Sequence, residues 1–144
     1  MKLVDANVLL YAVNTQSAHH EASRQWLDTS LSGGDRVGLA WLPLIAFTRL
    51  STSPRAFSAP LTPEQAMRRV QEWLAAPSAV IAQPTERHGI ILADLMAKAG
   101  TGGNLTNDAH MAALALEHRA TVVTYDTDFT RFPITSARPD QLLP

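Results

Sequence analysis

The chain has 144 residues, of which 46% are hydrophobic, and its 12 Lys and Arg against 13 Asp and Glu give a net charge of −1. These values are typical of one folded domain, and they argue against a protein that holds duplex nucleic acid by overall charge. The absence of cysteine excludes disulfides, thiolate metal sites and a cysteine nucleophile.

No segment predicts a membrane span or an export signal. The longest apolar stretch covers residues 37–47, contains Pro43 and is too short to cross a bilayer. Lys2 and Asp5 enclose only two apolar residues, which leaves no hydrophobic region of a signal peptide. We therefore expect a cytoplasmic protein with a single domain over residues 1–144.

Short apolar segments alternate along the chain with segments of helical periodicity. The sequence predicts strands at residues 3–4, 37–39, 79–81 and 121–124. It predicts helices at residues 6–13, 18–31, 43–50, 63–75, 85–99 and 107–118, with Ser17, Thr62 and Thr85 as N-caps. Such alternation favours an α/β fold with a central, mostly parallel sheet and helices on both faces. Ligands of these sheets bind beyond the carboxyl ends of the strands.

Carboxylates follow the first and the last predicted strand. Asp5 comes directly after residues 3–4, Asp126 and Asp128 come directly after residues 121–124, and Asp108 lies in the first turn of the preceding helix. Each has an ordinary structural explanation: a helix cap for Asp5, a turn for Asp126 and the helix dipole for Asp108. Together, however, they are expected to converge at one edge of the sheet.

Converging carboxylates repel one another, and a hard divalent cation relieves that repulsion. Mg²⁺ prefers oxygen ligands and commonly binds one or two carboxylates together with a substrate phosphate. No cysteine or paired-histidine motif offers a site for a softer metal. The sequence therefore predicts a Mg²⁺ or Mn²⁺ site and, with it, phosphate chemistry.

Three segments resemble the motifs of a known family. Residues 2–10 resemble the opening of PIN domains, residues 104–115 the second acidic motif, and residues 121–129 the closing strand with its acidic pair. Their order, their spacing and the total length also agree. The chain is most similar to the compact bacterial toxins of VapC type, which belong to VapBC toxin–antitoxin pairs.

This resemblance implies a Mg²⁺- or Mn²⁺-dependent endoribonuclease that cleaves RNA such as tRNA or rRNA. It implies neutralisation by a cognate VapB-type antitoxin and a homodimer or a complex with the antitoxin. Catalytic roles fall on the four aspartates, with Asp5, Asp108 and Asp126 as metal ligands and Asp128 assisting. Asn7 and Thr124 match positions where a small polar side chain orients a carboxylate or a water.

The chain departs from the family at one position. Many PIN domains carry a Glu three residues before an Arg, on the helix after the second strand, where this chain has Ala46 before Arg49. No Asp or Glu lies between Asp35 and Glu64, so a shifted alignment does not restore the acid. This departure leaves open an alternative: a catalytically weakened PIN fold that binds RNA or protein.

Contacts to RNA are predicted from a local surplus of arginine. Arg49, Arg55, Arg68 and Arg69 face only Glu64 between residues 49 and 69, and Arg49 and Arg55 are the preferred phosphate contacts. Trp41 and Phe57 are candidates for base stacking, although core or dimer contacts are the more common use of such residues.

Two further enzyme classes remain as alternatives. A haloacid-dehalogenase-type phosphatase fits Asp126, Asp128 and Thr130 superficially, but only fourteen residues follow Thr130 and none is Lys. A DNA nuclease on the same fold fits less well, because the chain has no strongly basic arm.

Overall fold

A computed structural model describes residues 1–144 and contains one five-stranded sheet. The strand order is β3-β2-β1-β4-β5, and every neighbouring pair is parallel. The strands are short, with three residues in each of β1 to β4 and two in β5. Their bounds are β1 Lys2–Val4, β2 Val37–Leu39, β3 Ala79–Ile81, β4 Thr121–Val123 and β5 Ser136–Ala137.

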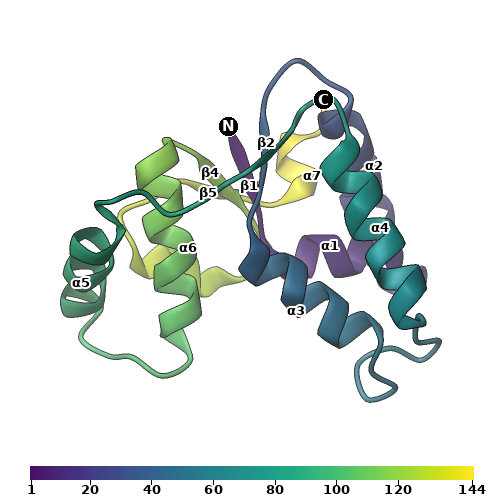
Figure 1. Cartoon of the computed structure of the whole chain (residues 1–144), viewed down its shortest axis with the longest axis horizontal. Helices are drawn as coiled ribbons and strands as arrows, with labels where there is room; N and C mark the ends of the chain where they lie inside the picture. Colours follow the sequence, from purple (N-terminus) through teal and green to yellow (C-terminus); the bar gives the residue numbers. More distant parts are fainter.

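Helices cover both faces of this sheet, which confirms the predicted α/β architecture. Figure 1 shows α5 and α6 on one side of the strands and α1 to α4 on the other. The helix bounds are α1 Ala6–Val13, α2 His20–Leu31, α3 Trp41–Ser51, α4 Pro63–Ala75, α5 His88–Ala99, α6 Leu105–His118 and α7 Pro139–Leu142, with a 3₁₀ helix, η1, at Thr127–Arg131.

The central strands are buried on both faces and divide the apolar core into two layers. Leu3 and Val122 point into the layer that contains α6, whereas Val4 and Val123 point into the layer beneath α1 to α4. This alternation follows from the two-residue period of a strand. It also explains why the strands consist almost entirely of apolar residues.

Four helix starts differ from the sequence-based predictions, and one of them is that of α3, which begins at Trp41 rather than residue 43. α2 begins at His20 rather than residue 18, because Ser17 Oγ accepts a hydrogen bond from the His19 amide in a turn that precedes the helix. α5 begins at His88 rather than residue 85, because Thr85 instead contacts Glu117 of α6. α6 begins at Leu105, two residues earlier than predicted.

The prediction for α4 is confirmed in detail. The Thr62 hydroxyl accepts a hydrogen bond from the Gln65 amide, and the Gln65 side chain accepts one from the Thr62 amide. These reciprocal contacts form a capping box, with Pro63 at the first helical position. No helix is long and apolar enough to cross a membrane.

The parallel register places the carboxyl ends of β1 and β4 side by side. Leu3 pairs with Val122 and Val4 pairs with Val123, and the Asp5 amide continues the ladder by donating to the Val123 carbonyl. The residues that follow these strands, Asp5 on one side and Thr124 on the other, therefore meet at the same edge. This edge carries the site described below.

A core substitution tests the packing of α3 on this scaffold. Phe47 is fully buried and packs edge-on against Trp73, with ring centroids 4.8 Å apart. We expect Phe47→Ala to lower the free energy of unfolding by about 3–5 kcal/mol in urea titration, because it leaves a cavity. Ile45→Ala, on the same helix at a residue that is 60% exposed, should change it by less than about 0.5 kcal/mol. Equal effects of the two substitutions would contradict the assigned packing.

Candidate metal centre

Asp5 occupies the junction between β1 and α1. It is the N-cap of α1, where one carboxylate oxygen accepts a hydrogen bond from the Ala6 amide at 2.8 Å. The other oxygen accepts from the Thr124 hydroxyl at 2.7 Å and from the Asn7 amide group at 3.2 Å. The cap predicted for Asp5 is thus present, and it fixes the carboxylate at the edge of the sheet.

Thr124 links the two halves of the site. Its buried hydroxyl donates to Asp5 and accepts from the Asn7 side chain at 3.1 Å and from the Asp126 amide at 2.9 Å. Asn7 also accepts from the Tyr125 amide at 3.1 Å, so its side chain bridges the same junction. The supporting positions that the sequence predicted, Asn7 and Thr124, therefore contact the carboxylate region directly.

The remaining three aspartates form a tight group. One carboxylate oxygen from each of Asp108, Asp126 and Asp128 lies within 4.8 Å of the others. Asp126 caps η1 by accepting from the Asp128 backbone amide at 2.9 Å, which orients the Asp126 side chain. Asp108 reaches the group from the first turn of α6. The structure thus brings together acids that are about twenty residues apart in sequence.

The pKa values of Asp108 and Asp5 reflect burial first and the repulsion between the acids second. Burial raises the pKa of Asp108 to about 6, with further contributions from the charges of Asp126, Asp5 and Asp128. Burial also raises the pKa of Asp5, although hydrogen bonds from Thr124, Ala6 and Asn7 act in the opposite direction. None of the four aspartates forms an ion pair with Lys or Arg.

This donor set fits a hard divalent cation. The grouped atoms are carboxylate oxygens, as Mg²⁺ and Mn²⁺ prefer, and no nitrogen or sulfur ligand stands among them. Repulsion that no basic side chain relieves would be relieved by a bound cation. The geometry is therefore suited to holding a metal ion and a phosphate oxygen at the carboxyl edge of the sheet.

The predicted RNA contacts lie outside this cluster. Arg49 in the last turn of α3 and Arg55 in the following turn are exposed and form no ion pair. Phe57 is buried, which makes it a core residue rather than a base-stacking one. Trp41 is exposed at the start of α3.

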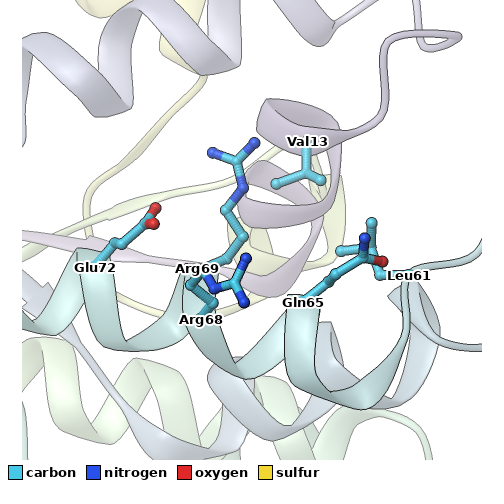
Figure 2. A pocket seen from close by; sticks show the side chains of 6 residues that line it. All are labelled: Val13, Leu61, Gln65, Arg68, Arg69 and Glu72. Atoms are coloured by element: carbon cyan, nitrogen blue, oxygen red, sulfur yellow. The ribbon is translucent and has the colours of Figure 1, made fainter.

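Arg68 and Arg69 line a separate hollow. They project from α4 into a space of about 400 Å³ that is also lined by Val13, Leu61, Gln65 and Glu72 (Figure 2). Val13 is the last residue of α1, whereas Asp5 caps its first turn. An eight-residue helix is about 12 Å long, so these arginines stand well apart from the carboxylates.

A series of polar contacts between α5 and α6 was not predicted from the sequence. Glu117, whose side chain is 1% exposed, contacts His88 Nδ1 at 2.5 Å, and His88 Nε2 contacts His110 Nδ1 at 2.9 Å. Burial raises the pKa of Glu117, but hydrogen bonds from Thr85 and His88 outweigh it and lower the pKa. This series of contacts ties α5 to α6, the helix that carries Asp108. Its two contacting pairs are 29 and 22 residues apart in sequence, and no local pattern indicates such a pairing.

Comparisons with known proteins agree with this arrangement. The family model described as PIN domain matches residues 2–134. The chain is 62% identical over 132 residues to Ribonuclease VapC37 of Mycobacterium tuberculosis, with 92% of each chain covered. The chain belongs to the PIN domain family.

Solved structures share the fold of this PIN domain. The Mycobacterium tuberculosis toxin VapC20, described as cleaving the sarcin–ricin loop, superposes with a TM-score of 0.71 at 15% identity, covering 96% of this chain and 100% of that one. VapBC2 from Rickettsia felis, bound to a promoter DNA fragment, superposes with a TM-score of 0.66 at 19% identity, covering 95% and 97%. At 15% and 19% identity, these superpositions show a shared fold alone.

Ala46 occupies the position at which many PIN domains carry a Glu. Ala46 is half-buried in the middle of α3, between Ile45 on the exposed face and Phe47 in the core. α3 carries no carboxylate at all, and Arg49 is its only charged residue. The carboxylates of the site therefore come from the ends of β1 and β4 and from α6.

The raised pKa of Asp108 gives a pH-dependent prediction. Because its pKa is 3.8 in a model peptide and about 6 here, the folded state binds this proton more tightly, and ionisation costs stability as the pH rises through this range. We expect Asp108→Asn to stabilise the metal-free protein at pH 7 in urea titrations, with the difference vanishing below about pH 4. Asp35→Asn, an exposed position outside the cluster, is the control. A destabilised Asp108→Asn protein at pH 7 would contradict the repulsion described.

Proposed function

We propose that residues 1–144 form one PIN nuclease domain that acts as a Mg²⁺- or Mn²⁺-dependent endoribonuclease, the toxin of a toxin–antitoxin pair. The observation that carries this proposal is the group of Asp108, Asp126 and Asp128 within 4.8 Å at the carboxyl edge of the sheet. The 62% identity to a protein named as a ribonuclease supports RNA as the substrate. No comparable carboxylate group favours another chemistry elsewhere in the chain.

The four aspartates have different roles at the site in this proposal. Asp108, Asp126 and Asp128 offer closely spaced oxygens to the ion, and Asp5 adds its charge from the neighbouring strand end. Thr124 and Asn7 are positioning residues that hold Asp5 through the contacts at 2.7 and 3.2 Å. Arg49 and Arg55 are proposed to contact RNA phosphates away from the cluster.

A bound divalent ion would supply charge stabilisation for the phosphate oxygens and lower the pKa of a coordinated water. The chain's own contribution is to fix the carboxylates before substrate arrives, through the Thr124 and Asn7 hydrogen bonds. Attack by water, rather than by the 2′-hydroxyl, leaves 5′-phosphate and 3′-hydroxyl ends.

A protein antitoxin of VapB type is the proposed partner, and the cytoplasm is the proposed compartment. The structural neighbour from Rickettsia felis is a VapBC complex, and this chain shares its fold over 95% of its length. A homodimer, or an assembly with the antitoxin, is proposed as the working form. tRNA or rRNA is the proposed target.

Cleavage of RNA by purified protein tests the function. We expect structured RNA to be cut with Mg²⁺ at a few positions that carry 5′-phosphates, and the cutting to stop with EDTA. Asp108→Asn and Asp126→Asn should each reduce the rate at least about 100-fold, because they remove stabilisation of the phosphate charge. Asp94→Asn, which breaks the exposed ion pair with Lys98, should cleave like the wild type.

Other results would separate the alternatives. Products with 2′,3′-cyclic phosphates would contradict hydrolysis by metal-activated water. RNA binding without any cleavage, from folded wild-type protein, would favour the weakened PIN fold that Ala46 leaves open as an alternative.

A further inference from the structure

One tryptophan differs from the other two in its surroundings. Trp26 and Trp73 are 3% and 6% exposed and belong to the core beneath α1 to α4, whereas Trp41 is 45% exposed. Trp73 packs edge-on against Phe47, but Trp41 takes part in no aromatic pair. Core packing therefore does not account for a large indole at this position.

Trp41 stands at the same edge of the sheet as the aspartates. β1 and β2 are neighbouring parallel strands in which Lys2 pairs with Val37 and Leu3 with Gly38. The same register, continued two residues beyond the Leu3–Gly38 pair, places Asp5 after β1 opposite Ala40 after β2. Neighbouring strands of a sheet lie about 4.8 Å apart. Trp41 is the next residue and the first of α3.

The exposed face of α3 continues away from this edge with an apolar side chain and a cation. Ile45, one turn after Trp41, is 60% exposed, and Arg49, a further turn on, is exposed and forms no ion pair. From Trp41 to Arg49 the helix rises about 12 Å. α3 itself contains no Asp or Glu, and Arg49 is its only charged residue.

We propose that Trp41 stacks on an unpaired base of single-stranded RNA beside the acidic cluster, and that Arg49 contacts a phosphate farther along α3. This inference rests on the proposed nuclease function and names the form of RNA that the site accepts. Aromatic side chains combined with an unpaired cation are the usual means of holding single strands, because every base has a face to stack and every nucleotide a phosphate. A base paired in a duplex has no free face to offer.

A second copy of the chain fits this face less well. A stable protein interface buries about 800 Å² on each partner, and a large aromatic side chain supplies at most about 250 Å². Trp41 and Ile45 are the only large apolar side chains that α3 exposes. The position of Trp41 at the edge of the sheet that also carries the carboxylates is, in addition, of use to a substrate and not to a dimer.

Quenching of tryptophan fluorescence by RNA reports on Trp41, since the other two indoles are buried out of reach of a base. We would titrate the full chain in EDTA, which prevents cleavage, with an oligoadenylate of about eight nucleotides and with the corresponding duplex. The single strand should quench the wild-type emission, whereas Trp41→Phe should show no quenching although it still binds. Anisotropy of labelled RNA should show binding about 5- to 150-fold weaker for Trp41→Ala and within about 3-fold of wild type for Trp41→Phe. Ile90→Ala, which is 73% exposed on α5, is the control and should bind normally.

Three outcomes would overturn the proposal: equal affinity of Trp41→Ala and wild type, no quenching by the single strand, or equal quenching by the duplex. A Trp41→Ala protein that changes from dimer to monomer in sedimentation, with unchanged RNA affinity per protomer, would assign the face to a second copy. The nuclease proposal is tested separately by cleavage with Mg²⁺. Wild-type protein that stacks RNA but never cuts it would contradict that proposal and leave this one standing.

Discussion

The site depends on one hydroxyl group. Thr124 donates to Asp5 and accepts from Asn7 and from the Asp126 amide, so a single buried oxygen connects the end of β1, the start of α1 and the segment leading to η1. Without it, the parallel register would still bring the two strand ends together, but Asp5 would be held only by the Ala6 amide and the Asn7 side chain. Preorganisation of this kind allows a site to hold repelling charges at fixed positions before a cation or a substrate arrives.

The sequence predicts that these acids meet at one edge of the sheet, because each of them is tied to a strand or helix end. Asp5 and Asp126 follow short apolar strands, and carboxyl ends of parallel strands meet at one edge. It does not predict which acids approach most closely, since the grouping of Asp108, Asp126 and Asp128 depends on the side-chain directions set by η1 and α6. The contacts of Asn7 and Thr124 were expected only from the family resemblance.

Features that depend on contacts between distant residues are not predicted from the sequence pattern. The sequence pattern indicates Thr85 as a helix cap. In the structure, however, the Thr85 amide and hydroxyl both donate hydrogen bonds to Glu117, thirty-two residues away, and α5 starts three residues after Thr85. The strand β5 and the helix α7 are too short for a periodic pattern to indicate them. The contacts from Glu117 through His88 to His110 are likewise not indicated by any local sequence pattern, although they join α5 to α6, the helix that carries Asp108.

Crystals grown with Mn²⁺ would show whether the acidic group binds a divalent ion. We expect an anomalous difference peak within about 2.2 Å of carboxylate oxygens of Asp108 and Asp126. The peak should be absent from crystals of Asp108→Asn grown in the same way. A wild-type map with no peak at this edge of the sheet, or with Mn²⁺ bound only elsewhere on the molecule, would contradict the binding of a divalent ion by this group.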